Sequence, residues 1–436
     1  MTAQGAGRNV LLRTRSATRA GDIVGVLDIG TSKTVCLIVA APGVRGGLWR
    51  REGACVLGFG HRPSRGLKAG AVMDIESAVQ TLRDVVNQAE QSAGLTLNDA
   101  LVAVTCGRPR SIAFEAETRI EDRVRPADTD RLMEAGRNYA EREGYTLVHL
   151  NHVAYRLDGA GGVADPSGLA GAMLAADLHA VIVEDGPLRG LLQAIERAYL
   201  VPTGFVPAAY ASGLAATTEE ERQQGVTCID MGAGATTIAM FADGHLLWIG
   251  SVAVGGHHLT FDIARALSVK FAEAERLKTL YGTLDPASAS EGETAAADTG
   301  ADSWEPPLPH EVADADLGGI VAGRMSDLFA RVAESLERSG VAALATDRMV
   351  VTGGASQLRG LGAFAQEQLG ARVRVGRPKP VEGMPSFCTS PQFSTAFGLV
   401  QIALEPPATA GRSAGRADKE GTSYLKRVGQ WLRESF

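Results

Sequence analysis

A short pattern occurs twice in this 436-residue chain and constrains its fold more than any other feature. Residues 26–34 have the sequence VLDIGTSKT, and residues 228–236 have the sequence CIDMGAGAT. In each copy an apolar segment leads to Asp-x-Gly and small residues, and a second apolar segment follows, which predicts strand, turn and strand. One such turn is commonplace for Asp and Gly. Its recurrence near the start of each half of the chain predicts a duplicated fold with two equivalent hairpins.

The residue types in these turns suit an anion. Glycine and other small residues let backbone N–H groups approach a phosphate closely. Two such hairpins facing each other would clamp one triphosphate, and Asp28 and Asp230 would hold Mg²⁺ between them. Because Mg²⁺ keeps several of its waters, we expect the carboxylates to act through water. No G-x-x-x-x-G-K-[ST] segment is present, and Gly58 and Gly60 lack the third glycine of a dinucleotide fingerprint.

Two further segments are candidates for the same site. Residues 349–358, MVVTGGASQL, predict a strand that runs into paired glycines and then a helix, where a base or ribose can lie against bare backbone. Glu275 and Lys278 lie three residues apart on a predicted helix. Charge spacing alone favours a solvated ion pair for them.

Composition and charge limit the class of protein. The net charge of -7 disfavours a nucleic-acid partner. Five scattered cysteines indicate neither a disulfide framework nor a zinc site, and they fit a cytoplasmic protein. Helix-like segments at 74–93, 128–143 and 187–199 alternate with strand-like segments at 100–105 and 180–183, which predicts an α/β fold. Residues 1–20 are predicted to be a disordered basic tail, 285–316 a disordered insertion and 406–421 a flexible linker.

Residues 422–436 predict an amphipathic helix. Its apolar stripe consists of Tyr424, Leu425, Val428, Trp431, Leu432 and Phe436, and Lys426, Arg427 and Arg433 flank that stripe. The segment would be about 20 Å long, shorter than the roughly 30 Å bilayer core. We therefore expect it to lie on an anionic membrane without crossing it. The alternative is a terminal helix that docks back onto the body.

Together these motifs are similar in type and order to those of the actin, Hsp70 and sugar-kinase superfamily. Within it the chain resembles the FtsA family of bacterial cell-division proteins, from about Asp22 to Leu404 and again at the final helix. The similar segments are DIGTSK at 28–33, TEEER at 218–222, DIA at 262–264, AERLK at 274–278 and VTGGAS at 351–356.

The resemblance implies a two-lobed, actin-like α/β fold of duplicated, ribonuclease H-like halves. It implies a family-specific subdomain 1C at 105–182, which replaces an actin subdomain and carries polymer and partner contacts. The remaining boundaries are 21–104, 183–215 and 386–405 for subdomain 1A, 216–262 and 345–385 for subdomain 2A, and 263–344 for subdomain 2B.

The resemblance also implies ATP with Mg²⁺ as the ligand. The predicted binding residues are Asp28, Gly30, Thr31, Ser32, Lys33, Asp230, Gly232, Ala233, Gly234, Thr236, Gly255, Gly256, Glu275, Lys278, Gly353 and Gly354. Asp28 and Asp230 are the only candidates for a catalytic role. Many superfamily ATPases carry a water-positioning Glu or Gln before the second hairpin, but residues 201–218 have no acid or amide, and Ala208 or Val206 stands there. We therefore expect weak or no hydrolysis.

For partners, the resemblance implies filaments on the cytoplasmic side of the inner membrane at the division septum. There such a protein anchors the FtsZ ring and helps to recruit later division proteins. Residues 320–336 resemble the helix that binds the C-terminal peptide of FtsZ, with Arg324 as a contact, whereas the residue alone suggests an exposed helical cation. The alternatives are a PilM-like pilus-assembly adaptor and a superfamily ATPase or phosphotransferase, and neither accounts for the basic terminal helix.

Overall fold

The computed structural model describes residues 23–42, 45–46, 49–50, 53–285, 317–341 and 347–404. The predicted tail at 1–20, the linker at 406–421 and the helix at 422–436 lie outside the described residues, as does all of the 285–316 insertion except Asp285.

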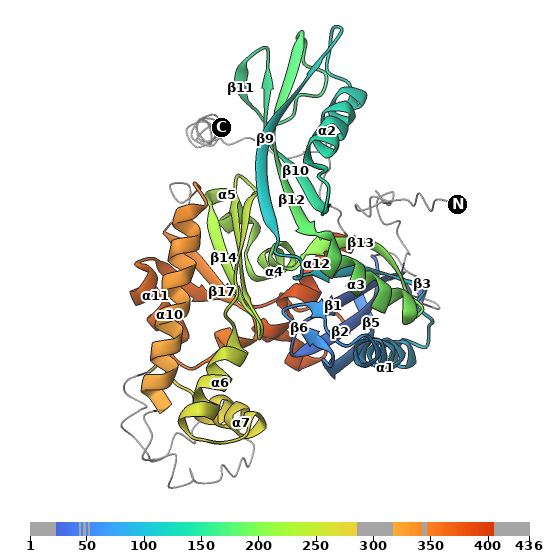
Figure 1. Ribbon diagram of the computed structural model, residues 1–436. Coiled ribbons are helices and arrows are strands. Elements are labelled where there is room, and N and C mark those ends of the chain that lie inside the picture. The colour runs from blue at the N-terminus through green and yellow to red at the C-terminus, as the bar shows by residue number, and fades with distance from the viewer. Residues whose placement is uncertain are drawn as a thin grey trace, which may run out of the picture.

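Two five-stranded sheets of the same topology form the two lobes (Figure 1). The first has the order β13-β8-β1-β2-β5, and the second has the order β16-β15-β14-β17-β18. In both, the strand that carries the motif aspartate pairs antiparallel with the next strand and parallel with a later one. The predicted duplication is therefore confirmed at the level of strand order and direction. The first sheet comprises β1 (Ile23–Ile29), β2 (Lys33–Ala40), β5 (Cys55–Pro63), β8 (Asp99–Val104) and β13 (Val201–Pro207), and the second comprises β14 (Val226–Met231), β15 (Thr236–Ala242), β16 (His245–Val252), β17 (Arg348–Thr352) and β18 (Arg372–Val375).

The helix predicted at 74–93 is α1 (Ile75–Ala93), which packs on the first sheet. Asp74 accepts hydrogen bonds from the first turn, and Gly94 ends the helix with a φ of 65°. The helix packs closely because Gly58 and Gly60 of β5 have no side chains. A Cβ at Gly60 would lie 1.9 Å from the carbonyl oxygen of Val85. These two glycines therefore serve helix-on-sheet packing.

The helices predicted at 128–143 and 187–199 are present at 126–140 and 185–197. In the first lobe, α3 (Asp185–Arg197) covers the sheet, and α4 (Ala208–Ala216) crosses α12 (Ser394–Leu404). The second lobe contains α5 (Glu219–Gln224), α6 (Gly256–Ala266), α7 (Phe271–Tyr281), α10 (Leu317–Arg338), the short η2 (Gly354–Gln357) and α11 (Leu361–Leu369). Two more 3₁₀ turns, η3 (Ser386–Thr389) and η4 (Pro391–Phe393), precede α12. Minor strand pairs are β3 (Arg45–Gly46) with β4 (Trp49–Arg50), and β6 (Leu67–Lys68) with β7 (Ala71–Val72).

A third sheet projects from the two lobes (Figure 1). Its order is β11-β10-β12-β9, formed by β9 (Arg110–Arg119), β10 (Tyr145–Leu157), β11 (Ala160–Val163) and β12 (Met173–Glu184), and α2 (Pro126–Ala140) packs on it. It has an apolar core of its own. The strand predicted at 180–183 is therefore only the end of a longer one.

Partly buried polar groups join this third sheet to β16. Ser111 accepts a hydrogen bond from the N–H of Ile249 at 2.7 Å and lies 2.9 Å from the ring of His179. Asn151 donates to the carbonyl of Leu246. Burial lowers the pKa of His149 to about 4 and that of His179 to about 3, so both rings are neutral near pH 7. These histidines have a structural role.

Within the described ranges, no helix combines the length and the apolar character needed to span a bilayer.

Candidate functional site

A cavity of about 590 Å³ lies where the two lobes meet, and both predicted hairpins line it. The two turns face each other closely. A Cβ at Gly234 in the second turn would lie 2.6 Å from the hydroxyl oxygen of Thr31 in the first. The absence of a side chain at Gly234 thus lets the turns approach. The arrangement provides two small-residue turns on opposite sides of one space.

The same hydrogen bond closes both turns. The N–H of Gly30 donates to the carbonyl of Lys33 at 2.9 Å, and the N–H of Gly232 donates to the carbonyl of Ala235 at 3.0 Å. A Cβ at Gly30 or Gly232 would lie within 3 Å of that carbonyl oxygen. Glycine is therefore needed at both positions for a steric reason, and the repeated Asp-x-Gly pattern encodes one local structure twice.

The two aspartates lie at the ends of β1 and β14 and both line the cavity. Burial raises the pKa of Asp28 to about 6, with a smaller contribution from the charge of Asp230, while Lys33 opposes the shift. Burial also raises the pKa of Asp230. Two carboxylates that resist ionisation in the same cavity favour a bound cation. Carboxylate oxygens, with room for water and phosphate oxygens beside them, are ligands that suit Mg²⁺.

This pair of aspartates is not part of a larger metal cluster. Among the described residues, no three His, Cys, Asp or Glu side chains come together as metal ligands.

Beside Asp230, the paired glycines abut the second hairpin. Gly353 has a φ of 88°, and a Cβ there would lie 2.3 Å from a carboxylate oxygen of Asp230. Both the backbone conformation and the close approach therefore require glycine. Gly354 begins η2 and lines the cavity beside it.

Glu275 and Lys278 form the predicted ion pair, with 2.7 Å between Oε2 and Nζ. The pair is only partly solvated, because the Lys278 side chain is 13% exposed and that of Glu275 is 41% exposed, and both residues line the cavity. Thr260 of α6 binds both, donating to Glu275 at 2.5 Å and lying 2.9 Å from Nζ of Lys278. The pair is thus fixed by a neighbouring helix, which sequence spacing could not reveal.

Two of the predicted binding residues do not line the cavity. The Thr236 side chain is fully buried and donates to the carbonyl of Val254, whereas the next residue, Thr237, lines the cavity. Side chains alternate along a strand, so Thr236 necessarily faces away from Thr237. Gly255 lies behind the second hairpin, where its Cβ would meet the carbonyl oxygen of Gly232 at 2.5 Å. The cavity is lined by the others, namely Asp28, Gly30, Thr31, Ser32, Lys33, Asp230, Gly232, Ala233, Gly234, Gly256, Glu275, Lys278, Gly353 and Gly354.

Several cavity residues were not predicted. Pro391, Gln392 and Thr395 come from the segment before and at the start of α12, and Thr395 donates to Asp230 at 3.2 Å. His257 enters at the N-terminal end of α6. These residues belong to no repeated or glycine-rich pattern, so the sequence carried no local signal for them.

Ala208 lines the cavity at the first position of α4, and Val206 is buried in β13 and does not line it. Of the two candidate positions, Ala208 is therefore the one from which a water-positioning side chain would reach the cavity. Close packing fixes this helix, because a Cβ at Gly398 of α12 would lie 1.8 Å from the carbonyl oxygen of Ala211.

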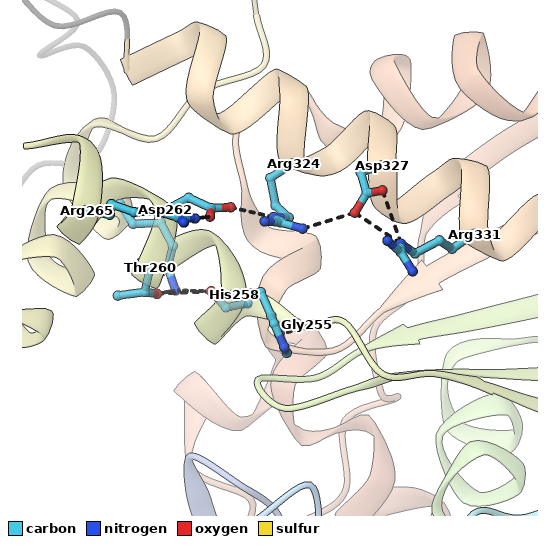
Figure 2. A network of polar contacts seen from close by, with 10 residues as sticks. Gly255, His258, Thr260, Asp262, Arg265, Arg324, Asp327 and Arg331 are labelled. Atoms are coloured by element: carbon cyan, nitrogen blue, oxygen red, sulfur yellow. Dashed lines mark hydrogen bonds and ion pairs between the residues drawn. The ribbon is translucent and has the colours of Figure 1, made fainter.

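Arg324 is held in an ion-pair network between α10 and α6 of the second lobe (Figure 2). Its guanidinium reaches Asp262 of α6 at 2.5 Å and Asp327 of its own helix at 3.0 Å. Asp262 also pairs with Arg265, and Asp327 pairs with Arg331. The simple alternative of an exposed helical cation is wrong, since the Arg324 side chain is 24% exposed and has two carboxylate partners.

Comparison with known families identifies two regions of the chain. Residues 227–398 match the model of the cell division protein FtsA, and residues 107–182 match the model of the SHS2 domain inserted in FtsA. The second match falls on the projecting sheet.

Comparison with solved structures shows the fold. The chain aligns with a protein of the PilM-PilN type IV pilus biogenesis complex at a TM-score of 0.60 and 18% identity, covering 88% of this chain and 100% of that one. At that identity the likeness concerns the fold alone.

Curated relatives match over nearly the whole length. The cell division protein FtsA of Rhizobium meliloti is 36% identical over 96% of each chain. That of Pseudomonas aeruginosa is 31% identical, covering 97% of this chain and all of the relative, and that of Escherichia coli K12 is 27% identical, covering 95% and 98%. With this extent of identity and both matched regions in place, the chain belongs to the FtsA family of cell division proteins.

Proposed function

We propose that this division protein binds ATP with Mg²⁺ in the cavity between its lobes. The observation that carries the proposal is the pair of identically closed turns that face each other across the cavity, each preceded by a cavity aspartate. The amides of both turns would hold the phosphates, and Asp28 and Asp230 would hold the cation through water. Glu275, Lys278, Gly353 and Gly354 would contact the adenosine. A bound Mg²⁺ supplies charge neutralisation at the phosphates.

Calorimetric titration with ATP tests this directly, with and without Mg²⁺. We expect saturable binding that requires Mg²⁺ in the wild type and is lost in Asp230→Ala. Asp243→Ala is the matched control, because Asp243 is another carboxylate of the second lobe but does not line the cavity. Absence of binding in the wild type would overturn the proposal.

The nucleotide is proposed to act as a switch and to be hydrolysed weakly or not at all. Ala208 stands on the cavity wall without a group that can orient or deprotonate water. Hydrolysis would then be slow compared with binding and release of the nucleotide. Whether the site holds a nucleotide would control self-association into filaments. Pelleting of the protein by ultracentrifugation in ATP and in its absence measures that control.

We further propose that residues 422–436 attach the protein to the cytoplasmic face of the inner membrane at the division septum. The support is the basic, Trp-bearing amphipathic pattern of the segment and the linker before it. A single copy would bind weakly, at about 1 kcal/mol for each cation near an anionic surface. Self-association would strengthen attachment through avidity, on the order of 10² to 10⁴.

Co-sedimentation with vesicles that contain phosphatidylglycerol tests the attachment. The full chain should pellet with vesicles, and a chain ending at Gly421 should not. Leu425→Glu with Leu432→Glu is a second variant that removes the apolar stripe and keeps the length. Equal pelleting of all three chains would refute the membrane role of this segment.

Arg324 is proposed to contact the C-terminal peptide of FtsZ, in line with its position on α10. In the free protein its charge is neutralised by Asp262 and Asp327, so an acidic peptide would exchange for these carboxylates. Arg324→Ala should weaken peptide binding about tenfold or more. Arg331→Ala is the control, because Arg331 also pairs with Asp327 but is 55% exposed and does not contact Asp262. An equal loss in both variants would argue against a specific contact.

The alternative functions are less well supported. The likeness to the PilM complex is one of fold at 18% identity, whereas the division proteins are up to 36% identical along the chain. A phosphotransferase would need a catalytic base beside the phosphates, and Ala208 occupies the place expected for it.

A further inference from the structure

The ammonium group of Lys33 lies in an unusual setting within the cavity. Its Nζ lies 5.2 Å from the centre of the Phe393 ring. Within the part of the chain that the structure describes, no carboxylate lies within 4.0 Å of it. Burial lowers the pKa of Lys33, and the charges of Asp28 and Asp230 oppose that shift. The ring face of Phe393 thus lies against the ammonium and stabilises its charge.

Phe393 is held rigidly under this lysine. Its side chain is fully buried, and three rings pack on it edge-on, namely Phe59 at 6.0 Å, His61 at 5.6 Å and Phe387 at 5.8 Å between centroids. Such edge-to-face contacts fix the direction of the ring normal. Burial, together with the charge of Lys33, lowers the pKa of His61, which keeps that ring neutral and avoids a competing cation.

The segment that carries Phe393 is tied to both sides of the cavity. The carbonyl of Pro391 accepts a hydrogen bond from the N–H of Gly353 at 3.3 Å, and Thr395 donates to Asp230 at 3.2 Å. Pro391 and Thr395 also line the cavity. Residues 391–395 therefore contact the paired glycines and the second hairpin while Phe393 contacts the lysine of the first.

We infer that Phe393 is a positioning residue that holds the ammonium of Lys33 toward the phosphates of the bound nucleotide. This inference rests on the proposed ATP site. A partly buried ammonium without a carboxylate partner is available to an anion, and the ring face holds it in place in the nucleotide-free protein. The role is one of preorganisation, since a lysine that is already placed loses less side-chain freedom when phosphate binds.

A double-mutant cycle on ATP affinity tests the inference. Phe393→Leu keeps an apolar side chain but removes the ring face, and it should weaken ATP binding about fivefold to tenfold. Lys33→Met alone should weaken ATP binding more than Phe393→Leu alone does. In the Lys33→Met background, Phe393→Leu should cause less than a twofold change, because the group on which the ring acts is gone. AMP affinity, measured by competition, should change less than twofold in Phe393→Leu.

Phe387→Leu is the matched control. Phe387 belongs to the same aromatic cluster but is 54% exposed and does not face Lys33, so ATP affinity should stay within twofold of the wild type. Equal losses from Phe393→Leu in the presence and absence of Lys33 would overturn the inference and assign the ring a purely structural role. So would unchanged ATP affinity in a folded Phe393→Leu protein. A wild type that does not bind ATP would instead refute the proposed function, so the two failures are distinct.

Discussion

Replacing Asp28 by Asn should stabilise the empty protein near neutral pH while abolishing its response to ATP. The pKa of Asp28 rises from 3.8 to about 6 in the folded state, mainly because the carboxyl is buried. The folded protein therefore holds this proton more tightly than the unfolded chain. This contribution to stability is complete below pH 3.8 and is lost as the pH rises through 6. At 1.36 kcal/mol per pKa unit, ionisation of this carboxyl lowers the free energy of unfolding of the nucleotide-free protein by about 3 kcal/mol at pH 7 to 8.

Urea unfolding between pH 5 and pH 8 measures this effect. Without nucleotide, Asp28→Asn should be more stable than the wild type by up to about 3 kcal/mol at pH 8, and the difference should shrink as the pH falls toward 5. With ATP and Mg²⁺ at about 100 times the dissociation constant, the wild type should gain about 2.7 kcal/mol and the variant almost nothing. The ionised Asp28 would then destabilise the nucleotide-free protein, and the bound cation would restore that stability.

Asp243→Asn separates the electrostatic effect from the functional one. Burial alone raises the pKa of Asp243 to about 6, and Asn tolerates its φ of 51°. This variant should show the same pH-dependent gain in stability and a normal response to ATP. A destabilised Asp28→Asn protein at pH 8, or a difference between variant and wild type that does not vary with pH, would refute the reasoning.

Gly353→Ala is expected to cost at least about 1 kcal/mol in stability and to weaken ATP binding measured by calorimetry, since it strains φ and meets a carboxylate oxygen at 2.3 Å. Gly94→Ala should cost a similar strain without a change in affinity, because nothing lies within 4 Å of a Cβ there. Steady-state phosphate release should be slow in the wild type and faster in Ala208→Glu, and a wild-type rate like that of an active chaperone ATPase would contradict the weak-hydrolysis prediction. Asp262→Asn should strengthen binding of a labelled FtsZ peptide about threefold in fluorescence anisotropy, because Arg324 loses one of its two counter-ions; unchanged or weaker binding would argue against an exchange of carboxylates.

Local patterns predicted the elements that depend on local physics. The apolar spacing of residues 74–93 predicted the helix, and Asp74 and Gly94 cap its two ends. The two Asp-x-Gly turns have the predicted form because glycine at 30 and 232 is needed to clear a carbonyl oxygen a few residues away in the same turn. The prediction for Thr236 failed for a local reason as well, because the alternation along β15 points its neighbour into the cavity instead.

Taken alone, the sequence determined that this protein has two equivalent hairpins, which motifs accompany them and which family it resembles, because turn geometry and strand alternation depend on residues that are neighbours in the chain. Only the tertiary structure decided what surrounds them. Phe393 lies under Lys33, Thr260 holds Glu275 and Lys278, and Asp262 neutralises Arg324. Glu275 and Lys278 are neighbours on one helix, but the other partners lie between 15 residues and several hundred residues apart in the sequence. No local period encodes such pairs, since they meet only when the packing of the lobes brings their elements together.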